Sequence, residues 1–264
     1  MKKKVALLLA MVVAATGVFV GCGGNKKTDN EFVVGFDAEY PPYGYMDDNG
    51  EYTGFDLELA EAVCELEGWT LKKQPIAWES KDQTLNSGEI DCIWNGFTMN
   101  GREDDYTFSV PYVDNSQVIV VAEKSGIKTF ADLAGKKVGV QAASAALDVL
   151  QDEEGQKALA DTFGSLEEFA DYNTAFTELM AGALDALAID IGVAKYQIES
   201  RGDGFEMLEE SLNKEQYAVG FRKSDGQELC DTVNAALQKL TDDGTVAKLA
   251  KKYGIEDFVI LKAK

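Results

Sequence analysis

The sequence predicts an α/β protein made of two similar lobes, each a mostly parallel sheet flanked by helices. Three observations lead to this prediction. The chain has 264 residues, of which 45% are hydrophobic and 10% aromatic, so it can bury one large core or two smaller ones. Short apolar strands alternate with helical segments along its length. In addition, one helix–strand template occurs twice.

The predicted elements follow one another in a regular order. A strand is predicted at 31–36 (EFVVGF), and the segment 55–68 has apolar residues at helical spacing and ends on glycine. Further strands are predicted at 90–94, 117–123, 136–140, 184–189 and 217–221, and two C-terminal helices at 231–244 and 245–254. This alternation is typical of sheets whose strands run mostly parallel.

The repeated template is L-x-x-G-x-φ-D-x-φ, where φ is an apolar residue. It occurs at 85–93 (LNSGEIDCI) and at 179–187 (LMAGALDAL), and in each copy a helix closes on glycine before a strand begins. Upstream of each copy, VGFD at 34–37 matches VGVQ at 138–141. The chain is therefore predicted to build one unit twice, although such helix caps also recur in unrelated α/β proteins.

The register of this repeat predicts where a ligand binds. Superposing the two copies places Gly96 opposite Asp190, and Asp37 opposite Gln141. Ligands of open α/β sheets bind beyond the carboxyl ends of the strands. These four residues are therefore predicted to face one cleft between the lobes.

Composition excludes several classes of function. The formal charge is −21, which argues against binding nucleic acid or an anionic membrane through a basic face. The sequence contains no histidine, which removes Ser-His-Asp and Cys-His nucleophiles and imidazole metal sites. No phosphate-binding loop is present. We predict no cofactor and no metal ion.

The N-terminus has the features of a secretory signal. Three lysines precede an apolar run at 5–20, which is short for a membrane span, although a retained anchor helix is the alternative. The following VGCGG resembles a bacterial lipoprotein signal, in which cysteine becomes the lipidated first residue. We therefore predict a signal peptide at 1–21, a lipid on Cys22, a net charge of −24 after cleavage, and a flexible tether at 22–30.

Three cysteines remain if Cys22 carries a lipid. Cys64, Cys92 and Cys230 lie in apolar patterns and are an odd number. Buried free thiols are the favoured interpretation over a disulfide bridge.

A carboxylate site is predicted from residues of both lobes. Arg102 follows the predicted strand end at 95–96 in a turn with two glycines, and Thr98 offers a hydroxyl in the same turn. A guanidinium pairs with a carboxylate through two parallel hydrogen bonds. In the other lobe, Ser144 is a candidate N-cap before Ala145, and free N–H groups at a helix start attract anions. The alternative for Arg102 is a surface ion pair with Glu103 or Asp105.

A cation site is predicted at Asp190, which ends the apolar segment AIDIG. A carboxylate in such surroundings needs a cationic partner, and an ammonium group would serve. The alternative is an ordinary helix N-cap. If Arg102 and Asp190 face the same cleft, they would hold the carboxylate and the ammonium group of one amino acid.

The remaining candidates would surround a side chain. Asp37 ends the first strand, the prolines at 41–42 stiffen the turn between Tyr40 and Tyr43, and Trp78 follows a short strand. Aromatic rings of this kind line small pockets, although each could instead be a core residue. The acidic run DDNGE at 47–51 is interpreted as a hairpin turn rather than a calcium loop.

Together these residues resemble the polar amino-acid-binding lipoproteins of ATP-driven importers, bacterial extracellular solute-binding protein family 3, which have a type II periplasmic-binding-protein fold. The segments that carry the resemblance span nearly the whole mature chain; they are GFDAEYPPYGYMDDNGEYTGFDLELAEAV, GEIDCIWNGFTMNGREDDYTFSVPY, KKVGVQAASAAL, GALDALAID and YAVGFRKSDGQELCDTVNAALQKL. The resemblance implies lobe 1 at 31–114 and 217–264, lobe 2 at 115–216, and hinge strands near 112–118 and 212–218.

The resemblance also implies roles for the candidate residues. Arg102 would bind the ligand carboxylate with Thr98 and the amides near Ser144 and Ala145. Asp190 would bind the ammonium group with the Gly96 carbonyl and the Thr98 hydroxyl. The side-chain end would be lined by Asp37, Tyr40, Tyr43, Trp78, Asn95 and Gln141. The turn before Arg102 is one residue shorter than the common form, and AAS replaces a segment that is usually rich in glycine and threonine.

The implied function is capture of a polar or basic L-amino acid, or cystine, outside the cytoplasm. The protein would be a monomer, anchored by lipid to the outer face of the cell membrane, and it would deliver the ligand to a permease coupled to an ATPase. A sensor that presents the ligand to a membrane receptor is one alternative. An enzyme on the same scaffold, such as a dehydratase with Asp37 or Glu79 as general base, is another.

Overall fold

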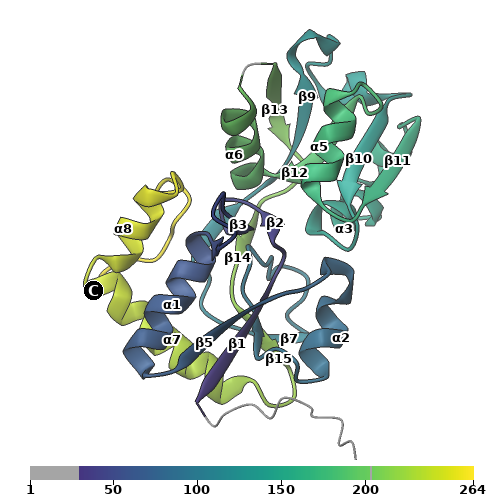
Figure 1. Ribbon diagram of the computed structural model, residues 1–264. Helices are drawn as coiled ribbons and strands as arrows, with labels where there is room; N and C mark the ends of the chain where they lie inside the picture. Colours follow the sequence, from purple (N-terminus) through teal and green to yellow (C-terminus); the bar gives the residue numbers. More distant parts are fainter. Residues whose placement is uncertain (1–29, 203) are drawn as a thin grey trace, which may run out of the picture.

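The computed structural model describes residues 30–202 and 204–264. The predicted signal peptide at 1–21, the predicted lipid on Cys22 and the tether up to residue 29 lie outside these residues. The chain forms two lobes, one above the other in Figure 1. Within the described ranges, no helix has the length and apolar character needed to cross a bilayer.

The first lobe is built on a five-stranded sheet. Its strands are β1 (Glu31–Phe36), β5 (Thr70–Pro75), β6 (Cys92–Ile93), β7 (Tyr106–Phe108) and β15 (Gly220–Arg222). They lie in the order β5-β1-β6-β15-β7. Because β15 pairs antiparallel with both of its neighbours, it alone runs against the other four.

The second lobe repeats this arrangement. Its strands are β9 (Gln117–Ala122), β10 (Lys137–Gln141), β11 (Ser165–Phe169), β12 (Ala186–Asp190) and β13 (Phe205–Ser211). They lie in the order β11-β10-β12-β9-β13, and β9 alone runs against the others. Both sheets are therefore mostly parallel, as predicted.

The sequence repeat is confirmed in the strand register. Val34 of β1 pairs with Cys92 of β6, and Val138 of β10 pairs with Ala186 of β12. These are the same pairs that the repeated template puts at equivalent positions. The repeat is thus a property of the fold and not a chance recurrence of helix caps.

The aspartate of the template has the same role in both lobes. Asp91 accepts a hydrogen bond from the backbone N–H of Val33 at 2.8 Å, and Asp185 accepts one from that of Lys137 at 2.9 Å. The carboxylate before β6 therefore joins that strand to β1, and the carboxylate before β12 joins that strand to β10. Each aspartate provides an acceptor for a backbone N–H of the neighbouring strand, which is consistent with an acid at this position in both copies of the template.

Helices cover both faces of each sheet. The first sheet packs against α1 (Phe55–Glu67), α2 (Lys81–Asn86), α7 (Gln227–Asp242) and α8 (Thr245–Lys252). The second packs against α3 (Ala145–Gln151), α4 (Lys157–Ala160), α5 (Tyr172–Met180) and α6 (Ile191–Arg201). Three short 3-10 turns lie at Trp78–Ser80, Glu123–Ser125 and Phe130–Leu133. Helix α1 ends at Gly68, whose φ of 70° closes it as predicted.

Side-chain alternation along the strands explains the two helical layers. Val34 and Phe36 of β1 belong to the core that contains α1 and α7, whereas Val33 packs with Leu85 of α2. The same division occurs in the second sheet, where alternate residues of β12 pack against α3 or against α5. Successive strand residues point to opposite faces, so both faces must be covered.

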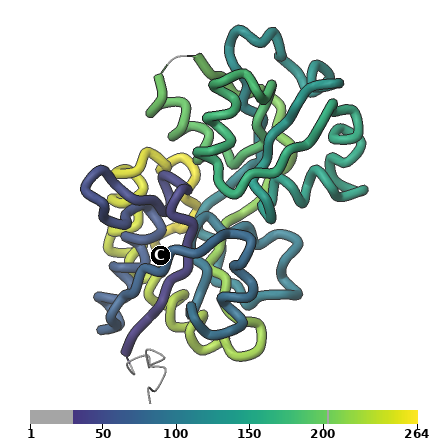
Figure 2. The backbone as a smooth tube through the Cα atoms, turned by 45° about the vertical axis from the view of Figure 1, so that its right-hand side comes forward, coloured from purple at the N-terminus to yellow at the C-terminus, as the bar shows by residue number. Residues whose placement is uncertain are grey.

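The lobes are joined by a two-stranded ribbon, β8 (Val113–Asn115) with β14 (Glu215–Tyr217). The tube in Figure 2 passes between the lobes along this ribbon. The C-terminal segment runs beside it, because the backbone N–H of Asp114 donates to the carbonyl of Phe258 at 2.8 Å. The predicted lobe divisions at 114/115 and 216/217 fall on these strands.

Two predicted strands are shorter than expected. The strand expected at 90–94 is only Cys92–Ile93, and the one expected at 217–221 divides into β14 and β15. Between β14 and β15 the backbone N–H of Ala218 donates to the carbonyl of Phe97, and that of Val219 donates to the Ser109 hydroxyl. The apolar segment therefore continues between β14 and β15, but its backbone N–H groups donate to neighbouring loops and not to an adjacent strand.

The hairpin and the thiols agree with the sequence. Strands β2 (Glu39–Tyr40), β3 (Gly44–Met46) and β4 (Tyr52–Thr53) form a small antiparallel sheet, with the predicted turn between β3 and β4. Cys64, Cys92 and Cys230 are buried, and Cys64 and Cys230 are free thiols.

Candidate functional site

A small cavity lies between the lobes. Its volume is only about 10 Å³, so the lobes nearly close it, and residues of both lobes line it. The lining consists of Tyr40, Trp78, Gly96, Thr98, Arg102, Gln141, Ser144, Ala145 and Asp190, all of which are candidates from the sequence. The other three candidates, Asp37, Tyr43 and Asn95, are buried but are not part of the lining.

Arg102 lines this cavity. The turn that carries it is closed by a hydrogen bond from its backbone N–H to the carbonyl of Met99, and its guanidinium lies over the Phe97 ring at 5.1 Å. Its Nη2 atom forms an ion pair with Asp148 of α3 at 2.7 Å. The predicted surface partners at 103–105 are therefore not used. Because the Asp148 side chain is 61% exposed, this ion pair contributes little to stability.

The start of α3, at Ser144 and Ala145, also lines the cavity. The Ser144 hydroxyl accepts a hydrogen bond from the backbone N–H of Leu147 at 3.2 Å, so Ser144 is an N-cap. The preceding residue, Ala143, has a φ of 54°, which turns the chain sharply between β10 and α3. The first turn of a helix has N–H groups with no acceptor within the helix, so such groups are available to an anion.

Asp190 also lines the cavity and is only 3% exposed. Its Oδ1 atom accepts hydrogen bonds from Asn115 Nδ2, Gln117 Nε2 and the Tyr217 hydroxyl at 2.6–2.7 Å. Asp190 is the N-cap residue of α6 by position, as the alternative held, but its side chain makes no capping bond to the helix. Within the described ranges no lysine or arginine forms an ion pair with Asp190.

A second buried acid, Glu215 of β14, was not identified from the sequence. It is 4% exposed, and its Oε1 atom accepts hydrogen bonds from Thr98, Asn115 and Gln117 at 2.7–2.8 Å. Burial and the nearby charge of Asp190 raise the pKa of Glu215. Only one feature of the sequence indicated the cluster of Asp190 and Glu215 with their donors. It is Gln117, the polar first residue of the predicted strand at 117–123.

Asp37 and Gln141 connect the lobes at the side-chain end. Gln141 Nε2 donates to Asp37 Oδ2 at 2.7 Å, which joins the residues that the sequence repeat placed opposite each other. Burial raises the pKa of Asp37 to about 6. Trp78 lies edge-on to Phe97 with 5.8 Å between ring centroids, and Tyr40 lies 6.0 Å from Tyr172.

A buried acid of α1 supports the loop that carries Gly96. The Gly96 N–H donates to Asp56 Oδ2 at 2.5 Å, and the Tyr112 hydroxyl donates to the same atom at 2.8 Å. Gly96 has a φ of 56°, and a Cβ atom there would approach Tyr40 to 2.9 Å. This position therefore requires glycine, and Asp56 fixes its peptide against the cavity.

Asp56 makes stability depend on pH. Burial raises its pKa from 3.8 to about 7, so between these values the folded state binds more protons than the unfolded state. Folding stability therefore falls as pH rises from about 4 to 7 and then levels off. We expect the free energy of unfolding, measured with urea, to decrease less between pH 4.5 and pH 7.5 in Asp56→Asn than in the wild type. The difference should be on the order of a few kcal/mol. Identical decreases would contradict this assignment.

The family of this protein follows from a family model that matches most of the chain. Residues 32–256 match the model for bacterial extracellular solute-binding proteins, family 3. The chain belongs to this family. The matched residues include all of both sheets except Glu31, the ribbon of β8 and β14, and every candidate of the cavity.

Known members and solved structures resemble this family-3 protein along nearly its full length. The arginine-binding extracellular protein ArtP of Bacillus subtilis is 31% identical, over 96% of this chain and 98% of its own. The L-cystine-binding protein TcyJ of Escherichia coli K12 is 29% identical, over 86% of this chain and 84% of its own. A Streptococcus pneumoniae ABC uptake transporter substrate-binding protein with bound histidine has a TM-score of 0.83 and 33% identity, with coverage of 88% and 95%. The fold is that of type II periplasmic binding proteins.

Proposed function

We propose that this protein captures a free L-amino acid in the cavity between its lobes and delivers it to the permease of an ATP-driven importer. One observation carries the proposal. Arg102 and Asp190 come from different lobes and line the same cavity, which is nearly closed in this structure and would widen as the lobes separate, so that one molecule could contact both. A cation and an anion that line one cavity are complementary to a zwitterion.

Each end of the cavity suits one pole of an amino acid. The Arg102 guanidinium, with the amides at the start of α3, would hold the carboxylate. Asp190, the Gly96 carbonyl and the Thr98 hydroxyl would hold the ammonium group. A buried carboxylate without a cationic partner is costly, and a ligand ammonium would supply that partner.

The ligand side chain would extend towards Gln141 and Asp37, with Trp78 and Tyr40 beside it. An acid at this end favours a basic or hydrogen-bonding side chain over an apolar one. Arginine, histidine and cystine in the names of the similar proteins are consistent with this choice. We therefore propose a polar or basic L-amino acid, with L-arginine as the first candidate.

Binding of L-arginine should depend on pH through Asp37. A cationic side chain favours the ionised carboxylate, whose pKa is raised to about 6, so the proton must leave before binding at lower pH. We expect the Kd for L-arginine to be about tenfold higher at pH 5 than at pH 7.5. In Asp37→Asn the Kd at pH 7.5 should be higher and the pH dependence weaker, as measured by isothermal titration calorimetry. An unchanged pH profile in this variant would remove Asp37 from the ligand site.

Lobe closure would complete the site. Polar contacts that cross the cleft include Asp37 with Gln141, Arg102 with Asp148, and Lys81 Nζ with the carbonyl of Ala143 at 3.3 Å. Aromatic contacts cross it as well, since Tyr40 lies 6.0 Å from Tyr172 and Tyr45 lies 5.8 Å from Tyr196. Opening of the lobes by bending of β8 and β14 would break both kinds of contact. A ligand that contacts both lobes would favour the closed form because it binds that form more tightly.

A thermal-shift screen of the twenty common L-amino acids and cystine tests the proposed function. A ligand that binds the native state raises its melting temperature. A stabilising polar or basic amino acid that is recovered unchanged after incubation supports capture, and its chemical conversion would indicate an enzyme. Gene deletion that abolishes uptake supports transport, whereas loss of a signalling response alone would indicate a sensor. No stabilisation by any of these compounds would overturn the proposal.

We further propose that a lipid on Cys22 holds the protein at the outer face of the cell membrane, where it acts as a monomer. The lipoprotein-like signal supports the anchor, and the family consists of extracellular proteins. Membrane fractionation of cells that produce Cys22→Ser tests the anchor. Sedimentation of the purified protein tests the monomer.

A further inference from the structure

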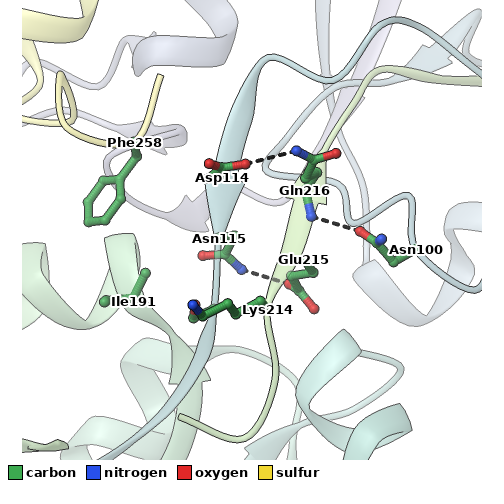
Figure 3. A pocket seen from close by; sticks show the side chains of 9 residues that line it. Asn100, Asp114, Asn115, Ile191, Lys214, Glu215, Gln216 and Phe258 are labelled. Atoms are coloured by element: carbon green, nitrogen blue, oxygen red, sulfur yellow. Dashed lines mark hydrogen bonds between the residues drawn. The ribbon is translucent and has the colours of Figure 1, made fainter. Parts of the chain in front are cut away.

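The hinge ribbon and the ligand cavity share one hydrogen-bond network, centred on Glu215. Figure 3 shows a pocket at the hinge, with Glu215 on one strand and Asn115 on the other, joined by a hydrogen bond. Glu215 lines this hinge pocket and also bonds to Thr98, which lines the ligand cavity. Glu215 therefore lies between the two.

The neighbours of Glu215 are all hydrogen-bond donors. Thr98 Oγ1, Asn115 Nδ2 and Gln117 Nε2 donate to its Oε1 atom, and Asn213 Nδ2 donates to Oε2 at 2.8 Å. A carboxylate only accepts hydrogen bonds, so it satisfies all four donors. A glutamine would place its NH2 group against at least one of them.

Glu215 also determines how the Thr98 hydroxyl is oriented. A hydroxyl has one proton, and the Thr98 proton is directed at Glu215 Oε1, 2.8 Å away. Its lone pairs are then left to accept a hydrogen bond on the cavity side. An ammonium group only donates hydrogen bonds, so it is complementary to a hydroxyl that is fixed in this way.

We propose that Glu215 is a positioning residue for the ligand ammonium group, which it serves by holding the Thr98 hydroxyl as an acceptor. This inference rests on the proposed amino-acid site and adds a residue that does not touch the ligand. The loop geometry supports it, because Thr98 is bridged to Tyr217 of the same strand and the backbone N–H of Met99 donates to the carbonyl of Gln216 at 3.0 Å. Thr98 is therefore held next to Glu215.

The test compares ligands that differ only in the α-ammonium group. The probes are L-arginine with 5-guanidinopentanoate, and L-glutamine with glutaramate, each titrated by calorimetry. For Glu215→Gln we expect the Kd of the amino acids to rise about tenfold, while the Kd of the deaminated probes changes less than threefold. A purely structural role in the hinge would weaken all probes equally, and that result would overturn the proposal.

Two further variants test whether Glu215 acts through Thr98. Thr98→Val should show the same selective loss, and Glu215→Gln in the Thr98→Val background should cost less than threefold more. Thr98→Ser keeps the hydroxyl and should recover most of the affinity for the amino acids that Thr98→Val loses. An equal cost of Glu215→Gln in both backgrounds would contradict the mechanism. If Glu215→Gln does not fold, Thr98→Val still tests the proposal. It would be overturned if Thr98→Val weakened the amino acids no more than the deaminated probes.

Asp114→Asn is the matched control. Asp114 lines the same hinge pocket and bonds to Gln216 Nε2 at 2.9 Å, but it is exposed and forms no hydrogen bond with Thr98 or Asp190. Asp114→Asn removes one negative charge from the same region of the fold. We expect the Kd of all four probes for this variant to equal that for the wild type. If the wild type binds neither L-arginine nor L-glutamine, the amino acid that the thermal-shift screen identifies and its deaminated analogue replace these probes. If the screen identifies none, the proposed function fails, which is a different result from a failure of Glu215.

Discussion

Replacing Arg102 with alanine is expected to weaken amino-acid binding by about 2–5 kcal/mol, which is roughly 30-fold or more in Kd. The substitution leaves the ligand carboxylate without its cation inside a cavity that excludes most water. The Arg102 side chain is only 13% exposed, and it is held by the Phe97 ring and by the carbonyl of Thr98, so the guanidinium is preorganised. Calorimetry with the amino acid that stabilises the protein most in the thermal-shift screen measures the effect.

Two controls separate recognition from charge. Arg102→Lys keeps the charge but loses the planar fork, so its affinity should lie between those of the wild type and Arg102→Ala. Lys157→Ala removes a positive charge from an exposed i,i+4 pair with Asp161 and should leave the Kd unchanged. Unchanged binding by Arg102→Ala would show that the carboxylate is held elsewhere.

Local patterns were sufficient to predict most of the fold. The 3.6-residue period of 55–68 and its terminal glycine became α1 with a left-handed cap at Gly68. The repeated template predicted equivalent strand pairs in two sheets, including the register that brings Asp37 to Gln141. These features follow from sequence because each depends on residues that are close along the chain or on an internal copy.

The hinge network could not be predicted in this way. Glu215 accepts hydrogen bonds from Thr98, 117 residues before it, and from Asn115, 100 residues before it. Nothing local distinguishes this glutamate from the exposed acids around it in a chain with 46 acidic residues. Its burial results from the pairing of β8 with β14, which is a long-range property of the fold.

Local sequence patterns also could not predict which of the buried side chains reach the cavity. A strand end indicates that residues lie near the cleft, but not which of them reach the cavity. Tyr43 and Asn95 are 1% exposed and lie outside the lining, because the turn at 41–43 and the loop at 94–97 direct them into the core. Arg102 in turn pairs with Asp148 of the other lobe and not with the acids that follow it.

Asp190→Asn should have an effect as large as that of Arg102→Ala, about 2–5 kcal/mol. Three donors already converge on Oδ1 of Asp190, so the amide nitrogen of asparagine would occupy the other position. It would then present an NH2 donor where the proposal puts the ligand ammonium group, which also only donates.

The two substitutions should differ in which analogues they still bind. Asp190→Asn is expected to lose the amino acid but to keep the affinity of its deaminated analogue within a few-fold, because that analogue has no ammonium group. Arg102→Ala should lose both, since both carry the carboxylate. Calorimetry of each variant with each probe gives four values. The assignment of opposite poles to Arg102 and Asp190 is contradicted if Asp190→Asn weakens the deaminated analogue as much as the amino acid.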